Sequence, residues 1–218
     1  MAGHAATDQQ ETKPRSTGSV LILGHSFVRR LQKYLVETEG DNSLQLCQFN
    51  SIRFCGLSGA VVSDLWSKLA LVREVTPDIV LLEIGSNDLC DQNVSPRKFV
   101  TELQEFVQTL VTSCCVKRVI ISQIFYRGPG YHPRRNQRNL KAYNLTVFNT
   151  NQKLQQTFYQ SRRHRSVIYY RHRGIWKDFH QYLLADGVHL NPVGNKKLKT
   201  SYRKALILAG REININNP

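Results

Sequence analysis

The sequence has no long apolar run, no paired-cysteine pattern and, over one third of its length, no acidic residue. No apolar stretch approaches the roughly 20 residues that a membrane-spanning helix needs, and the N-terminal segment lacks the apolar region of a secretory signal. The five cysteines are odd in number and show no Cys-x-x-Cys spacing, which argues against a disulfide framework and against a zinc site. These absences predict an intracellular protein of the cytoplasm or nucleus, neither secreted nor membrane-spanning.

The missing acidic residues leave a strong positive charge in one part of the chain. Between residues 106 and 177 there are 14 Lys and Arg and no Asp or Glu, whereas the rest of the chain is balanced. The formal net charge of +14 therefore belongs to this segment. Such a surface attracts nucleic acid, anionic membrane or acidic protein, although it can also be a solvated face without a specific partner. The predicted contact residues are Arg134, Arg135, Arg138, Arg162, Arg163, Arg165, Arg171 and Arg173.

The apolar residues that are present fall into short runs that alternate with amphipathic segments. Strands are predicted at residues 19–24, 44–49, 78–85, 118–125 and 166–170, and helices at 27–37, 63–75, 95–114, 139–158 and from 192 onward. Ser63 and Ser95 stand where two of these helices need an N-cap. The alternation predicts one α/β domain over residues 19–211, a three-layer α/β/α sandwich around a mostly parallel five-stranded sheet. The flanking residues 1–18 and 212–218 are predicted to be tails, the first of them disordered.

Ser26 follows the first predicted strand, within "LILGHSFVRR" (21–30). In a parallel sheet, working side chains collect beyond the carboxyl ends of the strands. A serine at this place can cap the following helix, which is its ordinary role, or it can present its hydroxyl as a nucleophile. The segment by itself favours the cap, so the choice depends on what else lies at this edge of the sheet.

Three further short segments bear on that choice: "GLSG" (56–59), "GSND" (85–88) and "DGVH" (186–189). Each is weak evidence alone, since "GSND" consists of turn-forming residues and an Asp-x-x-His pair is common on surfaces. Together with "GHS" (24–26), and in this order and spacing, they resemble the four sequence blocks of the SGNH (GDSL-like) hydrolase family over about residues 19–208. The resemblance implies the flavodoxin-like fold of that family and an ester-hydrolysing activity.

The resemblance also implies a role for each residue. Ser26 would be the nucleophile, His189 the general base and Asp186 the carboxylate that orients the imidazole. The oxyanion would be received by the backbone N–H groups of Ser26 and Gly59 and by the side-chain amide of Asn87. These groups make up the chemistry of acyl transfer to water, which needs no metal and no cofactor.

The sequence departs from the family pattern at two places. His25 stands where the first block usually has Asp, and Phe54 and Cys55 precede Gly56 where the second block usually begins with Asn. Both changes leave the reacting groups intact and alter the hydrogen bonding around them. Gly59 suits a close backbone approach that a side chain would block, with Gly56 as the competing candidate.

The predicted function is a serine esterase that hydrolyses a carboxylic ester with a small acyl group, such as acetyl, through an acyl-Ser26 intermediate. The alternative is a weak or inactive hydrolase scaffold that binds nucleic acid or anionic lipid through its basic surface, where aromatic residues are interleaved with arginine. The stretch "VLILGHSFVRRL" also looks similar to the esterase domains that some animal LINE-type retrotransposons encode.

Overall fold

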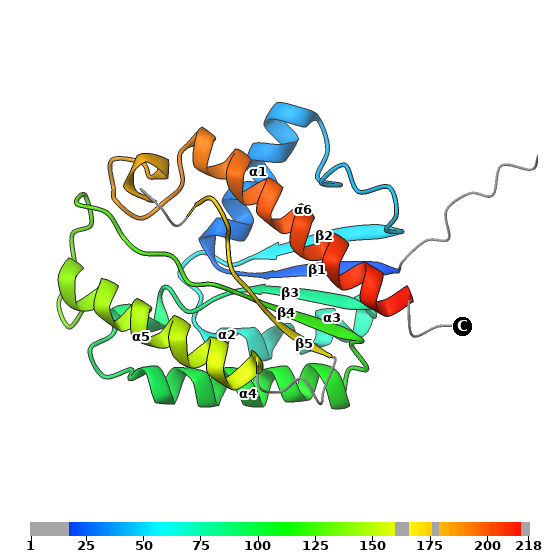
Figure 1. The fold of residues 1–218 in the computed structure, drawn as a ribbon, viewed down its shortest axis with the longest axis horizontal. Coiled ribbons are helices and arrows are strands. Elements are labelled where there is room, and N and C mark those ends of the chain that lie inside the picture. Colours follow the sequence, from blue (N-terminus) through cyan, green and yellow to red (C-terminus); the bar gives the residue numbers. More distant parts are fainter. Residues whose placement is uncertain (1–17, 160–165, 176–178, 215–218) are drawn as a thin grey trace, which may run out of the picture.

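A five-stranded parallel sheet with helices on both faces forms the centre of the molecule (Figure 1). The computed structural model describes residues 18–159, 166–175 and 179–214. The strands are β1 (Ser19–Gly24), β2 (Ser51–Gly56), β3 (Ile79–Glu83), β4 (Arg118–Ser122) and β5 (Val167–Tyr170), in the order β2-β1-β3-β4-β5. The helices are α1 (Ser26–Glu39), α2 (Val62–Leu65), α3 (Leu69–Val75), α4 (Pro96–Thr112), α5 (Leu140–Tyr159) and α6 (Pro192–Asn214). All four strand pairs are parallel, so the predicted α/β/α sandwich is confirmed.

Two apolar cores lie on opposite faces of the sheet, because successive side chains of a strand point to opposite sides. In β1, Val20 and Ile22 belong to the core shared with α1 and α6, whereas Leu21 and Leu23 belong to the core shared with α2 to α5. Figure 1 shows α1 and α6 on one side of the sheet and the other four helices across it. The central strands are therefore buried on both faces, which is why they read as continuous apolar runs.

The second strand lies at Ser51–Gly56, so the prediction of a strand at 44–49 was wrong. Leu44 and Gln45 have φ angles of 54° and 52°, a left-handed conformation that is incompatible with an extended strand. The segment instead forms turns, and Leu44, Leu46 and Phe49 are buried in the core on the α1 and α6 side. Its hydrophobicity reflects burial of a loop, which a short apolar pattern does not distinguish from a strand.

The predicted helix over 63–75 is divided into α2, a 3-10 turn η1 (Trp66–Lys68) and α3. Its N-cap is Val61, so the prediction that Ser63 caps it was also wrong. The N–H groups at its start are bound by acidic side chains instead: Asp64 accepts from Val61 at 3.0 Å. Asp88, in the "GSND" segment, accepts from the backbone of Val62 at 2.8 Å and so ties this short helix to the end of β3.

The ends of the longer helices agree better with the prediction. Ser95 caps α4 by accepting from the N–H of Lys98 at 3.2 Å, with Pro96 as the first helical residue. The last helix begins at Pro192 as expected and continues to Asn214, beyond residue 211. None of the helices in the described part of the chain is long and apolar enough to cross a lipid bilayer. The predicted N-terminal tail, apart from Gly18, and residues 215–218 lie outside the described residues.

Candidate active site

Ser26 is the first residue of α1, directly beyond the end of β1. The N-cap of this helix is His25, whose Nδ1 atom accepts a hydrogen bond from the backbone N–H of Phe27 at 3.3 Å. The capping role that Ser26 alone suggested is thus filled by its neighbour. The Ser26 side chain is half-buried, and its hydroxyl has no hydrogen-bond partner among the described residues. A free hydroxyl at a helix start, where the helix dipole favours negative charge, is suitably placed for a nucleophile.

His25 is buried and connects the end of β1 to the end of β3. Its backbone N–H donates to the carbonyl of Glu83 at 3.1 Å, and its Nε2 atom lies 3.0 Å from the hydroxyl of Ser86. Because Nδ1 accepts from Phe27, the hydrogen of the neutral ring is on Nε2, which donates to Ser86. Desolvation lowers the pKa of His25 to about 4, against a raising effect of Glu83. The ring is therefore neutral at pH 7.

Asn87 and Gly59, the predicted oxyanion donors, lie near each other, since the Asn87 amide reaches the residue that follows Gly59. Asn87 is the only residue between Ile79 and Cys90 that is not buried, and its amide donates one hydrogen to the carbonyl of Ala60 at 2.9 Å. The second amide hydrogen remains available. The backbone N–H groups of Ser26 and Gly59 are likewise unpaired within the described ranges. Three donors of the predicted kinds are thus free at one edge of the sheet.

The backbone conformation of Gly59 favours glycine at this position. Its φ angle is 77°, and a Cβ atom there would meet no protein atom within 4 Å. Gly56 is the residue with the close approach, because a Cβ there would lie 2.2 Å from the backbone nitrogen of Arg29. The Arg29 guanidinium also donates to the hydroxyl of Ser58 at 2.9 Å. Gly56 therefore packs β2 against α1, and Gly59 remains the donor candidate.

Asp186 and His189 form the predicted pair. The Nδ1 atom of His189 lies 2.7 Å from Oδ2 of Asp186, and the other carboxylate oxygen accepts from the backbone N–H groups of Val188 and His189 at 2.9 Å each. Burial works to raise the pKa of the Asp186 carboxyl, but these hydrogen bonds outweigh it and lower the pKa below its usual value. Since the carboxylate only accepts, Nδ1 of His189 carries the hydrogen and Nε2 is left with a lone pair for a proton.

The loop that carries this pair is held against the rest of the site. The ring of His189 lies against the ring of Phe27, with 6.3 Å between the ring centroids. Phe27 is the residue that follows Ser26 in the chain. No hydrogen bond joins Ser26 and His189, both of which are described. Gly187 has a φ angle of 64° and accepts a hydrogen bond from the N–H of Gly128 at 2.7 Å. All four predicted sequence blocks thus converge at the carboxyl edge of the sheet.

Arg127 is a residue of this region that sequence reasoning missed. Its guanidinium is buried between the rings of Tyr131 and Tyr143, at 4.2 and 4.4 Å from their centroids, and donates to the carbonyl of Ser86 at 3.3 Å. Asn144 binds the backbone of Arg127 with both ends of its amide, at 2.9 and 3.0 Å. Nothing in the composition separates Arg127 from the exposed arginines around it. Its signal is its position, directly after an apolar run.

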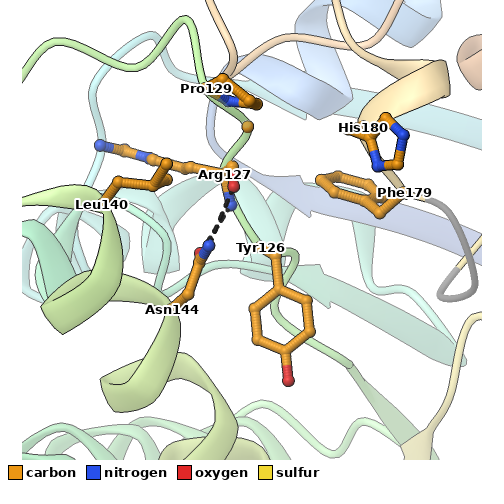
Figure 2. Close-up of a pocket in the computed structure, with 8 residues that line it drawn as sticks. Tyr126, Arg127, Pro129, Leu140, Asn144, Phe179 and His180 are labelled. Carbon is orange, nitrogen blue, oxygen red and sulfur yellow. Dashed lines mark hydrogen bonds between the residues drawn. The ribbon is translucent and has the colours of Figure 1, made fainter.

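A pocket of about 510 Å³ lies beside the Asp–His loop. Figure 2 shows its lining residues, which come from the segment after β4, the start of α5 and the 3-10 turn η4 (Phe179–Tyr182). The dashed line in the figure is the contact between Asn144 and Arg127. Gly128 lines the pocket and also donates to Gly187, so the pocket adjoins the loop of Asp186 and His189.

The residues predicted for the basic surface fall into three groups. Arg134, Arg135, Arg171 and Arg173 are exposed. Arg138 is half-buried, and its guanidinium donates to the backbone carbonyls of Leu89, Gln92 and Val94 at 2.8 to 3.0 Å, so it fixes the segment after "GSND". The third group, Arg162, Arg163 and Arg165, lies outside the described residues.

The profile of the GDSL-like Lipase/Acylhydrolase family matches residues 22–197, and the chain belongs to this family. A search of curated proteins found no significant match. Solved structures with the same fold include a GDSL-like lipase from Bacteroides thetaiotaomicron, with 15% identity and a TM-score of 0.64 over 88% of this chain and 89% of that one.

Two other similar structures carry more specific descriptions. A putative platelet activating factor from Streptococcus pneumonia has 19% identity and a TM-score of 0.65 over 88% of this chain and 84% of that one. An acetylxylan esterase from Geobacillus stearothermophilus has 16% identity and a TM-score of 0.62 over 88% and 95%. At these identities the likeness establishes the fold. The resemblance to LINE-encoded esterase domains stays a prediction, since none of these matches bears on it.

Proposed function

We propose that the protein is a serine esterase that hydrolyses carboxylic esters of short acids through an acyl-Ser26 intermediate. The observation that carries the proposal is the 2.7 Å contact between Asp186 and His189. The imidazole of His189 also packs against Phe27, the residue that follows Ser26. The short acyl group is supported by similar structures that are described as acetyl esterases or acetylxylan esterases.

The mechanism follows from the tautomer of His189. Asp186 holds the hydrogen on Nδ1, so Nε2 takes the proton of the Ser26 hydroxyl as its oxygen attacks the ester carbonyl. The developing oxyanion is received by the N–H groups of Ser26 and Gly59 and by the free amide hydrogen of Asn87. Each such donor is typically worth about 3 kcal/mol of transition-state stabilisation. Nε2 then returns the proton to the leaving alcohol, and water repeats the sequence on the acyl-enzyme.

A fluorophosphonate probe tests this assignment, because it reacts with activated serines. We expect the wild-type chain to be labelled at Ser26, as located by peptide mass spectrometry, and Ser26→Ala to lose labelling completely. Asp186→Asn should fold normally and lose reactivity by orders of magnitude, since an amide can stabilise the wrong tautomer of His189. Ser58→Ala is the matched control, a nearby serine outside the proposed machinery, and should label like the wild type. Labelling that persists in Ser26→Ala would overturn the proposal.

A further inference from the structure

The β5 edge of the sheet carries a basic groove that the proposed hydrolysis does not use. β5 is the last strand of the sheet, and Figure 1 shows it between α5 and α6. A hollow of about 880 Å³ follows this edge. The residues that define it here are Tyr169, Tyr170, Arg171, Arg173, Lys204 and Arg211, and we call it the β5 groove. Ser26, Asn87, Asp186 and His189 are not among its lining residues.

Among the described residues, the positive charge of the β5 groove has no acidic partner. Its four cationic side chains are exposed, none of its lining residues is acidic, and no carboxylate within the described ranges forms an ion pair with them. Elsewhere on the surface basic residues do find partners, as in the pairs Lys117–Asp78 at 2.7 Å and Lys199–Glu39 at 2.6 Å. Four cations around one hollow repel one another, and an anionic ligand relieves that repulsion.

The two tyrosines add aromatic surface to the lining of the groove. Tyr169 and Tyr170 are neighbours on β5 and therefore point to opposite faces of the sheet, one toward each core. Both are partly exposed, and the hydroxyl of Tyr169 donates to Asn151 at 3.3 Å, which orients its ring. Burial raises the pKa of both hydroxyls, so they stay neutral and do not repel an anion. Leu208, exposed at 43%, extends the apolar surface along α6.

We infer that the β5 groove binds single-stranded nucleic acid, with phosphates on the four cations and bases against the tyrosine rings. Alternation of basic and aromatic side chains along a channel is the arrangement that recognises single strands without sequence preference. The concave shape favours a flexible single strand, which can enter the hollow and contact its floor, over the planar surface of a lipid bilayer. It also favours a single strand over a duplex, whose bases are stacked and turned away from the tyrosines.

The test uses the full chain and a fluorescently labelled 12-nucleotide oligo(U), with fluorescence anisotropy as the readout at several salt concentrations. The groove variant is Arg171→Gln, Lys204→Gln and Arg211→Gln combined. The matched control is Arg73→Gln, Arg97→Gln and Lys98→Gln, three exposed residues on or near α3 and α4 that remove the same charge. Thermal melting confirms that both variants are folded.

We expect the groove variant to lose at least about tenfold in affinity, and its salt slope to fall by about 2, since each phosphate contact contributes about 0.7 for a single strand. The control should change by less than about twofold. Tyr169→Leu, which keeps the charge, should weaken binding of the same oligonucleotide at high salt.

Equal losses of affinity in both triple variants would mean bulk attraction only and would overturn the inference. So would groove-dependent binding to phosphatidylserine vesicles or polyglutamate without binding to oligo(U), or equal affinity for a matched duplex. Because Ser26→Ala should bind oligo(U) normally, failure of the esterase proposal and failure of this one are distinguishable.

Discussion

His25 stands at one of the two places where the sequence departs from the family pattern, and its side chain makes two contacts in the structure. Its Nδ1 caps α1 in front of Ser26, and its Nε2 donates to Ser86 at the end of β3. An aspartate at this place could provide the cap, but its carboxylate is shorter than the imidazole ring and reaches less far toward the hydroxyl of Ser86. His25 is thus a positioning residue: its cap fixes the first turn of α1, which begins at Ser26, and its contact with Ser86 adds stability.

Substitutions of His25 separate these two contacts. His25→Asn keeps an oxygen that can cap Phe27 but is too short for Ser86, and we expect a loss of about 1 kcal/mol in stability and little change in fluorophosphonate labelling. His25→Leu removes both contacts, costs about 1 kcal/mol more through the lost cap, and should slow labelling of Ser26 at least tenfold in protein that is still folded. Urea unfolding and labelling rates measure the two effects. Equal labelling rates in the two variants would contradict the positioning role.

At the scale of elements, the contact between β2 and α1 sets the place of Ser26. A Cβ at Gly56 would lie 2.2 Å from the backbone nitrogen of Arg29, so Gly56→Ala must push α1 away from the strand. We expect a loss of about 1–3 kcal/mol, as for other overpacked sites, together with slower labelling of Ser26. Gly40→Ala, at the other end of α1, is the control: its φ angle of 76° makes alanine costly by about 1–2 kcal/mol, but no atom lies within 4 Å. It should lose stability without losing labelling, whereas equal labelling in both variants would refute the role of Gly56.

The same element shows what the sequence could predict. β1, β3 and β4 are buried on both faces, and their continuous apolar runs were sufficient to find them. β2 is an edge strand in which the exposed residues Ser51 and Arg53 alternate with the partly buried residues Ile52 and Phe54. Its period-two pattern is the signal that would have identified it, and it was outweighed by the more hydrophobic buried loop before it. Edge strands and buried loops differ in tertiary packing, which local hydrophobicity does not record.

The convergence of the candidate site residues at one edge of the sheet was predictable for a different reason. Ser26, Asn87, Asp186 and His189 lie in short blocks whose order and spacing are independent of where strand boundaries fall. What surrounds them was not predictable, because Arg127 and Asp88 are buried charged residues whose roles depend on segments distant in the chain. Asp88, for example, holds the start of α2, a contact across 26 positions.

At the scale of the whole molecule, burial shifts the pKa values of two groups in opposite directions. Desolvation lowers the pKa of His25 to about 4 and raises the pKa of Asp88 to about 6. His25 favours the folded state above pH 6.5, and this contribution is lost as the pH falls toward 4, because only the unfolded chain then takes up the proton. The contribution of Asp88 to stability changes with pH in the opposite direction: it is present below pH 3.8 and is lost as the pH rises through 6. Each amounts to about 3 kcal/mol at most, at about 1.4 kcal/mol per pKa unit.

These opposing contributions predict that the stability of the wild-type chain changes little between pH 6.5 and pH 4. Asp88→Asn removes the stability contribution that grows on acidification, and the amide keeps an oxygen that accepts from the N–H of Val62. We therefore expect the variant to be more stable than the wild type at pH 7, and to lose up to about 3 kcal/mol between pH 6.5 and 4. Asp78 and Asp186, whose pKa values are lowered, lose their contributions mainly below pH 4 and so affect both proteins alike. Urea unfolding at half-unit pH steps measures the difference. Parallel curves of unfolding free energy against pH for the two proteins would show that Asp88 does not titrate in this range. The buried Oδ2 atom of Asp88, which has no hydrogen-bond partner among the described residues, would then be stabilised by a contact other than a proton.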